Sequence, residues 1–352
     1  MRRIYVCHTY YHVYVSYLKE FYEHADSCDE ATICLSKMST DFSNLSERIR
    51  NVGLFGSVIE LDEKEYTFFP ELEKYKIDRG NAFLNLLQRI VFTKKFAKLQ
   101  EPYMTVDFSA YDDIYVYCDN DPIGYYLNYK RIKYHSVEDG LDTLKPFIPA
   151  FYDNRGLFKL KKLLSVYFNV LFIRDGYSKY CIDMEVNDLS VLKDDYHKYK
   201  ELPRKKMVDS LTDKQKEYIM KTFVNDEERL QNEISKIPSG KKSILILTEP
   251  LCALDVRRRL FEDLVAKYKD EGTVFVKPHP RDVLDYNEIF DDIVVFERLM
   301  PMEVFSLYKQ GMFDVVVSVL TQLGCADFAK EKVYLGYDFL DIYEDPSVHR
   351  KG

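Results

Sequence analysis

A histidine between two prolines has the most suggestive chemical setting in this sequence. His279 has Lys277 and Arg281 two residues away on either side. The apolar run 274–276 precedes them and predicts a buried strand that ends at the prolines, because proline cannot donate to a sheet ladder. His279 should therefore stand at the carboxyl end of a strand, the edge where open α/β sheets bind ligands.

The chemistry that fits this position is stabilisation of a departing phosphate. A nucleotide leaving group needs a donor where negative charge grows, and His279 could act there as hydrogen-bond donor or general acid. Lys277 and Arg281 would add positive charge, and Pro280 would stiffen the backbone. We therefore predict that Lys277, His279 and Pro280 bind an activated donor substrate.

Two adjacent carboxylates, Glu138 and Asp139, follow the strand expected at 131–137 and precede Gly140. One of them could be a general base that takes the proton from an acceptor hydroxyl. Neighbouring residues of a strand point to opposite faces, so only one carboxylate should enter the site. An Asp-Gly pair is also a common turn, which is the alternative explanation.

Two predicted helix starts supply further candidates. Ser318 and Thr321 follow a valine-rich strand, and the N–H groups of a helix amino terminus there would suit a phosphate. Simple helix capping explains the same residues. Glu303, in a first helical turn, could accept from ribose hydroxyls, and a favourable charge at a helix start explains it equally well.

Alternating strands and helices must position these residues in the first part of the chain. The expected strands are 3–7, 31–36, 57–61, 114–118 and 131–137, and the expected helices are 13–21, 42–51, 81–98 and 122–129. Thr9 is the predicted N-cap of the first helix. The alternation predicts a mostly parallel sheet covered by helices on both faces. The absence of a GxGxxG motif argues against a dinucleotide site.

Helix 81–98 shows helical periodicity with Phe83, Leu86, Leu87, Ile90 and Val91 on one face, which predicts that this face packs against the core. Beyond it, we expect short strands at 180–184 and 189–192 and one charged helix at 213–234.

A polar segment with proline and glycine, 238–242, is the predicted domain boundary. After it the alternation restarts, with strands at 243–247, 273–276, 293–296, 314–317 and 332–335 and helices at 255–268, 302–308 and 321–329. We therefore predict an α/β protein of two Rossmann-like domains, 1–238 and 239–352. The first would bind the acceptor and the second the nucleotide-activated donor.

The segment 141–173 breaks the alternation. Its prolines are followed by a run of leucines and lysines at 157–164. A basic segment beside apolar residues can lie on a membrane with acidic lipids. The alternative, which we favour, is a core helix with a solvated lysine face.

Composition narrows the class of protein. A net charge of −8 argues against a nucleic-acid partner bound through bulk charge. The seven cysteines, at positions 7, 28, 34, 118, 181, 252 and 325, form no CxxC pair. They are typical of free thiols in the cytoplasm and argue against structural zinc. The sequence contains no run of about 18 apolar residues, so we expect no membrane span.

These motifs carry a resemblance. The Glu-Asp-Gly and His-Pro elements, followed by a Ser/Thr element, are similar to the motif set of bacterial sialyltransferases. The opening Cys7–His12 and the element Leu247–Leu251 most resemble glycosyltransferase family 52, the lipooligosaccharide sialyltransferase family. Two Rossmann-like halves joined by one linker also suggest the GT-B architecture, in which two domains face each other across a cleft.

The resemblance implies a metal-independent, inverting enzyme without a cofactor. It would transfer N-acetylneuraminic acid from CMP-sialic acid to a terminal galactose of a surface glycan. Glu138 or Asp139 would be the base and Asp255 a rival base. His279, Ser318 and Thr321 would contact the donor phosphate, and Glu303 would contact the ribose.

The resemblance also implies an acceptor on a lipid carrier, loose contact with the inner face of the cytoplasmic membrane, and a homodimer. Asp119 and Asp121 form an Asp-Asn-Asp sequence, which we interpret as a turn and helix start. Two alternatives stay open: a hexosyl- or polyol-phosphate transferase on the same scaffold, and a non-catalytic partner in surface polysaccharide synthesis.

Overall fold

The structure is a computed structural model that describes residues 1–25, 30–38, 40–141, 143–144, 148–192, 196–238, 240–308 and 311–349. The chain divides into two compact units, Met1–Leu211 and Thr212–Gly352. The structural boundary thus precedes the one expected at 238/239, because the helices that follow Leu211 pack with the second unit. For example, α8 (Asp213–Phe223) contacts the short 3-10 helix η6 (Met302–Val304).

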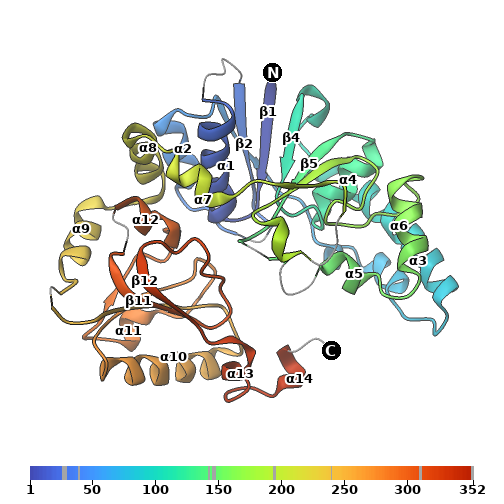
Figure 1. Cartoon of the computed structure of the whole chain (residues 1–352). Coiled ribbons are helices and arrows are strands. Elements are labelled where there is room, and N and C mark those ends of the chain that lie inside the picture. The colour runs from blue at the N-terminus through green and yellow to red at the C-terminus, as the bar shows by residue number, and fades with distance from the viewer. Residues whose placement is uncertain are drawn as a thin grey trace. The chain divides into compact units, whose positions relative to one another are not determined.

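In the first unit, seven strands of the described chain form a parallel sheet in the order β3-β2-β1-β4-β5-β6-β7 (Figure 1). They are β1 Arg2–Cys7, β2 Glu30–Ser36, β3 Ser57–Leu61, β4 Asp113–Val116, β5 Tyr134–Val137, β6 Cys181–Val186 and β7 Tyr199–Glu201. The chain first adds strands on one side of β1 and then continues with β4 on the other side. The gap between β1 and β4 is therefore the topological switch point, where ligands bind in such sheets.

The helices of the first unit are α1 Tyr10–Glu23, α2 Leu45–Val52, α3 Ala82–Leu99, α4 Pro122–Lys130, α5 Pro149–Asp153, α6 Phe158–Val166 and α7 Arg204–Asp209. Thr9 caps α1 as predicted, because its side chain accepts from the His12 N–H. One core cluster joins strand residues such as Ile4 and Ile114 to Ile123 and Leu127 of α4.

In the second unit, five strands of the described chain form a parallel sheet in the order β10-β9-β8-β11-β12. They are β8 Ser243–Leu247, β9 Thr273–Lys277, β10 Val294–Val295, β11 Phe313–Ser318 and β12 Ala329–Tyr334. The helices are α8, α9 Glu227–Ser235, α10 Leu254–Lys269, α11 Tyr286–Ile289, α12 Phe305–Tyr308, α13 Gly336–Leu340 and α14 Pro346–His349. The switch point of this sheet lies between β8 and β11.

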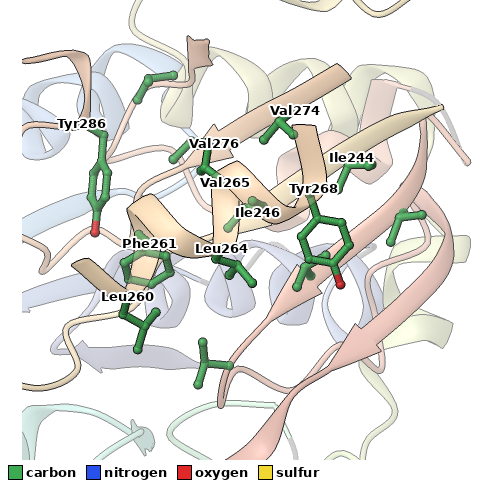
Figure 2. Close-up of a cluster of buried hydrophobic side chains, with 14 of the residues drawn as sticks. Ile244, Ile246, Leu260, Phe261, Leu264, Val265, Tyr268, Val274, Val276 and Tyr286 are labelled. Atoms are coloured by element: carbon green, nitrogen blue, oxygen red, sulfur yellow. The ribbon is translucent and has the colours of Figure 1, made fainter. Parts of the chain in front are cut away.

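The core of the second unit lies between α10 and the strands. Figure 2 shows Leu260, Phe261 and Leu264 of α10 gathered with Ile246 and Val276 of the neighbouring strands. All of these side chains are buried, as the helical spacing of the α10 residues and the continuous apolar strands predict.

Three element predictions were wrong. Residues 189–191 form a 3-10 helix instead of a strand, because Asp188 accepts from the Ser190 N–H and caps a turn. The helix expected at 213–234 is two helices, since Asp226 caps a new helix at Arg229 N–H. No helix occupies 319–328, all of which are described, because the first N–H groups there bind a side-chain carboxylate.

Two segments place apolar side chains outside the core. On α3, Phe83, Leu87 and Val91 are exposed, whereas Leu86 is buried and Ile90 is partly buried, so the predicted core face is only partly correct. On α6, Phe158, Leu164 and Val166 are partly buried against a core cluster, whereas Leu160 and Leu163 are exposed, so the favoured prediction of a core helix is only partly correct.

The six cysteines among the described residues are free thiols; Cys28 lies outside the described residues. Within the described part of the chain, no helix combines the length and apolarity needed to cross a membrane.

Candidate functional site

The carboxyl ends of β1, β4 and β5 meet beside the switch point of the first unit. His8 and His12 follow β1, and Cys118 and Asp139 follow β4 and β5. Both histidines are buried, whereas half of the Asp139 side chain (51%) is exposed. The Asp139 carboxylate is thus open to solvent, and the two histidines beside it are buried.

His12 holds the Asp139 carboxylate in place. The His12 Nε2 atom lies 2.8 Å from Asp139 Oδ1 and 2.8 Å from the Asp139 carbonyl oxygen. The imidazole stacks on the Tyr117 ring, with ring centroids 4.6 Å apart. The Cys118 thiol donates to the same carboxylate oxygen at 3.1 Å. Asp139 is therefore positioned from two neighbouring strand ends.

The backbone determines which nitrogen of His12 carries the proton. The His8 N–H donates to His12 Nδ1 at 3.0 Å, so Nδ1 is an acceptor and the neutral ring carries its proton on Nε2. Burial lowers the pKa of His12, which keeps the ring neutral. Partial desolvation would raise the pKa of Asp139, but the hydrogen bonds from His12 and Cys118 hold it below its usual value. The Asp139 carboxyl is therefore ionised in the free protein.

Glu138 points the other way. Its side chain is buried and accepts from the Asn187 N–H at 2.9 Å and the Leu144 N–H at 3.3 Å. These bonds hold the loop after β5 and the end of β6. The two adjacent carboxylates thus differ in exposure, and Asp139 is the one that faces solvent.

His8 forms a second histidine–carboxylate contact beneath Asp139 and His12. His8 Nε2 lies 2.6 Å from Glu63 Oε1 and 3.4 Å from Asp121 Oδ2. Burial would lower the pKa of His8, but Glu63, Asp121 and Asp139 outweigh burial and raise it to about 9. The raised pKa favours the protonated ring, and the described residues offer no acceptor for its buried Nδ1. Glu63 also accepts from the Ile123 N–H at 2.8 Å, which ties α4 to this network.

Gly124 of α4 packs so closely against the turn between β4 and α4 that no side chain fits there. A Cβ atom on Gly124 would lie 1.8 Å from the Asp119 carbonyl oxygen. Any larger residue would push α4 away from the acidic turn 119–121. The predicted turn and helix start are confirmed, since Pro122 begins α4.

His8, His12 and Cys118 offer possible ligand atoms within 4.8 Å of one another. In the structure both His12 nitrogens and the Cys118 thiol are hydrogen-bonded to protein groups. Burial raises the pKa of Cys118, which keeps the thiol protonated. The three residues act here as a hydrogen-bond network that orients Asp139.

A cavity of about 150 Å³ opens beside Asp139. Its lining includes Arg174 and Asp175, whose side chains pair at 2.9 Å, and Ser136, whose buried hydroxyl has no partner in the described chain. Asp175 has a left-handed backbone (φ 59°), a strain that clusters at functional sites. The lining thus offers both hydrogen-bond donors and acceptors beside Asp139.

In the second unit, His279 stands at the carboxyl end of β9 as predicted. Its N–H donates to Thr248 Oγ1 at 3.2 Å, and its Nδ1 accepts from the Arg281 N–H at 3.1 Å. The neutral ring therefore carries its proton on Nε2, for which the described residues offer no acceptor. Burial, with Arg281 and Lys277, lowers the pKa of His279 to about 4.

Lys277 and Glu303 were expected to contact the donor substrate, but Lys277 is buried and Glu303 is partly buried. The buried Lys277 Nζ donates to the carbonyls of Pro278 at 2.6 Å and Arg298 at 3.0 Å. Burial lowers the pKa of Lys277 to about 7 and raises that of Glu303 to about 7. Lys277 thus ties the loop after β9 to the loop that carries Arg298, and Glu303 is partly buried nearby.

The N–H groups expected to cradle a phosphate are bound to Glu249. Val319, Leu320 and Thr321 each donate a backbone N–H to its carboxylate at 3.0 Å. The Ser318 hydroxyl donates to the Thr321 carbonyl at 2.7 Å. The loop after β11 is therefore an anion-binding nest filled by a side chain from the end of β8.

The structure keeps the other predicted residues apart from these clusters. Asp255 lies exposed in the first turn of α10, where its carboxylate has no hydrogen-bond partner among the described residues. Pro280 is partly exposed beside His279. Asp139 belongs to the first unit, and Asp255 and His279 belong to the second.

Sequence reasoning assigned no role to His12, Arg174 or Glu249. The polar turn 8–12 directly after the first strand was a signal for His12, and the Thr-Glu-Pro element at 248–250 was one for Glu249. Arg174 has no comparable signal, because it lies in an irregular segment that only the fold brings to the end of β5.

Comparison with known proteins identifies relatives of this chain. The sequence model of glycosyltransferase family 52 matches residues 78–321. An uncharacterized protein of Haemophilus influenzae is 32% identical over 74 residues, which are 21% of this chain and 23% of that protein. The matched segment is thus less than a quarter of that relative's length.

Two solved structures resemble the fold. An alpha/beta-galactoside alpha-2,3-sialyltransferase from Photobacterium phosphoreum has a TM-score of 0.54 at 11% identity, covering 95% of this chain and 90% of that one. The GT-B domain of a sialyltransferase from Photobacterium damselae has a TM-score of 0.54 at 15% identity, covering 93% and 89%. At these identities the likeness shows the fold, and the predicted GT-B class of two parallel-sheet units is confirmed.

Proposed function

Because the chain belongs to glycosyltransferase family 52, we propose that this glycosyltransferase is an inverting sialyltransferase. Its donor would be CMP-sialic acid, and its acceptor a terminal galactose of a bacterial surface glycan carried on a lipid. The observation that carries the proposal is the Asp139 carboxylate, which is ionised, held by a neutral His12 and lines a polar cavity. A homodimer stays a prediction.

Asp139 would act as the base in the transfer step. The acceptor hydroxyl oxygen attacks the anomeric carbon of the sialic acid, and the bond from that carbon to the CMP phosphate breaks. The hydroxyl proton passes to Asp139, and attack from the face opposite to CMP inverts the configuration. His12 would keep the carboxylate aimed at the hydroxyl, because its Nε2–H occupies one oxygen and leaves the other open.

His279 would stabilise the departing CMP. Its Nε2–H is available, and the neutral ring can donate to a phosphate oxygen as negative charge develops. Arg281 would add positive charge beside it, and the partly buried Glu303 would contact the ribose. Because Ser318 and Thr321 are engaged within the Glu249 nest, we assign the phosphate contact to His279 first.

The cavity beside Asp139 supports a neutral acceptor sugar. Arg174 is the basic side chain of the lining and pairs with Asp175, so an acidic sugar would meet the Asp139 carboxylate without a further basic side chain in the lining. Sugar hydroxyls can donate to these carboxylates and accept from the Arg174 guanidinium and the Ser136 hydroxyl. This balance of donors and acceptors favours a galactose-type residue over a uronic acid.

The decisive experiment compares donors. Calorimetric titration with CMP-sialic acid, CMP, UDP-galactose and UDP-glucose should show binding of the two cytidine compounds only, and release of CMP should follow with lactose as acceptor. Binding of a UDP-sugar without binding of CMP-sialic acid would refute the sialyltransferase and favour a hexosyltransferase.

The choice of base is tested separately. Asp139→Asn should lower kcat for transfer by about 10²–10⁴-fold with donor binding unchanged, as loss of a general base does. Asp255→Asn is the matched variant at the rival carboxylate. If Asp255→Asn loses transfer and Asp139→Asn keeps it, the base lies at the start of α10, and the role of the Asp139 cavity is reduced to binding.

A further inference from the structure

We propose that α3 and α6 together form a surface that docks onto a bilayer containing anionic phospholipids. Its residues are Phe83, Leu84, Leu87 and Val91 of α3 and, at and beyond α6, Leu157, Leu160, Leu163, Tyr167 and Phe168. All nine are exposed. This α3–α6 surface is independent of which sugar is transferred.

The two segments are neighbours in space although they lie far apart in the sequence. Leu86 and Ile90 of α3 belong to the same hydrophobic cluster as Phe158, Leu164 and Val166 of the α6 region. Figure 1 shows the two helices close together at one end of the first unit. Their inner faces therefore pack in one core, which places the exposed apolar faces on two neighbouring helices.

The outward stripes follow helical spacing. On α3, Leu84, Leu87 and Val91 recur at three and four residues, and on α6 Leu160 and Leu163 continue to Tyr167. Phe83 and Tyr167 are each 64% exposed. Large apolar side chains so exposed in one area mark an interaction site rather than ordinary surface.

The charge of this area is opposite to that of the chain. Residues 82–99 contain four basic residues and no acidic one, and residues 154–173 also contain four and none, although the chain carries a net charge of −8. In the sequence, the nearest acidic residues are Asp78 and Glu101 around the first segment and Asp153 and Asp175 around the second. Basic side chains around apolar ones complement a membrane whose headgroups are negative.

A basic cavity adjoins the surface. It has a volume of about 530 Å³, and its lining includes Lys94 of α3 and Phe168. Arg131 and Lys179 add two further cations, and the lining contains no carboxylate. The cavity thus offers a place for an anionic headgroup beside side chains that would enter the acyl region.

The charge pattern also distinguishes a membrane from a second copy of the chain. A symmetric dimer through this face would bring two equally basic surfaces together, and like charges at an interface are costly. A nucleic acid would match the charge but would leave the exposed leucines without an apolar partner. A bilayer with acidic lipids satisfies both features.

The test is co-sedimentation of the full-length protein with vesicles of phosphatidylcholine, with and without phosphatidylglycerol. We expect binding to the mixed vesicles, little binding to pure phosphatidylcholine, and weaker binding at high salt. Lys94→Glu with Lys159→Glu should weaken binding at least about 30-fold, because each basic residue at an anionic surface contributes about 1 kcal/mol. Phe83→Ser with Leu163→Ser should weaken it roughly tenfold or more.

Matched controls lie on the second unit. Lys236→Glu with Lys241→Glu removes the same charge, and Val283→Ser with Ile342→Ser replaces side chains that are 68% and 72% exposed. Both controls should bind vesicles like the wild type. Equal loss in a control and in its matched variant would overturn the proposal. The proposal would also be overturned if the wild type did not bind anionic vesicles. The same holds if the only effect of the α3–α6 variants were a change from dimer to monomer on gel filtration.

Discussion

His279 owes its proposed role to one backbone contact. The Arg281 N–H occupies Nδ1, so the neutral ring presents a proton on Nε2. Burial among positive groups lowers its pKa to about 4, which means that the ring is uncharged in the free protein at neutral pH. The geometry therefore favours a hydrogen-bond donor over a proton donor in the first encounter with substrate.

Two substitutions at His279 separate these roles. His279→Ala should lower kcat for transfer by about 10²–10³-fold, as loss of one donor to a developing oxyanion does. His279→Gln should recover part of this loss, because its amide can donate a hydrogen bond but cannot deliver a proton. Steady-state transfer assays measure both. A glutamine variant as poor as alanine would show that proton transfer is required.

The buried His8 makes the stability of the protein depend on pH. Glu63, Asp121 and Asp139 outweigh the effect of burial and raise its pKa to about 9, whereas the unfolded value is about 6.5. The folded state therefore holds this proton more tightly than the unfolded state. The stabilisation is complete below about pH 6.5 and is lost as the pH rises through about 9.

His8→Gln removes this dependence. Between about pH 6 and pH 10, the difference in unfolding free energy between wild type and variant should shrink by about 3 kcal/mol. Urea unfolding at the two pH values measures it, and groups common to both proteins cancel in the difference. A gap that stays constant with pH would mean that His8 is neutral in the fold.

At the scale of elements, Glu249 joins the two strands that flank the switch point of the second sheet. It follows β8 and accepts three N–H groups from the loop after β11. Burial raises its pKa, while those N–H groups act to lower it. The loop that begins at Ser318 therefore owes its shape to a carboxylate from another strand.

Glu249→Ala should reduce the unfolding free energy by about 3 kcal/mol or more, because it leaves three N–H groups without an acceptor. Glu249→Gln should cost less, since Oε1 alone accepts from all three. Glu331→Ala, an exposed control, should change stability by no more than about 0.5 kcal/mol. Chemical denaturation measures all three, and equal stability of Glu249→Ala and the control would show that the nest is dispensable.

At the scale of the whole molecule, the boundary between the two units follows packing rather than linker composition. The segment 238–242 looks like a linker, but Ile219 and Phe223 of α8 and Leu230 of α9 are buried before it. These helices belong to the second unit.

Expression of two fragments tests the boundary. The fragment 212–352 should unfold cooperatively in urea, because it includes its own core and the helices that cover it. The fragment 239–352 lacks three buried apolar side chains, and the burial of each contributes about 1.5–3 kcal/mol to the free energy of unfolding. This fragment should therefore aggregate or unfold at a much lower urea concentration. Equal behaviour of the two fragments would place the boundary at 238/239 after all.

Much of the architecture could be predicted from sequence because it depends on local periodicity. The apolar runs that became β1, β8 and β9 were placed to within a residue or two. The His-Pro element was placed correctly for the same reason, since Pro278 ends a strand wherever the strand lies. The loop after β11 could not be predicted, because a helix start and a carboxylate-bound nest differ only in a partner that lies 70 residues away in sequence.

By itself the sequence determined the alternation of strands and helices, the strand-end positions of Asp139 and His279, and the solvent exposure of one member of the Glu138–Asp139 pair. Only the tertiary structure decided what surrounds those positions. It placed His12 behind Asp139, Glu249 in the nest, and the apolar stripe of α3 beside α6 instead of in the core. The reason is physical: periodicity along a chain fixes which face a residue occupies, whereas hydrogen bonds and burial depend on which distant segments the fold brings to that face.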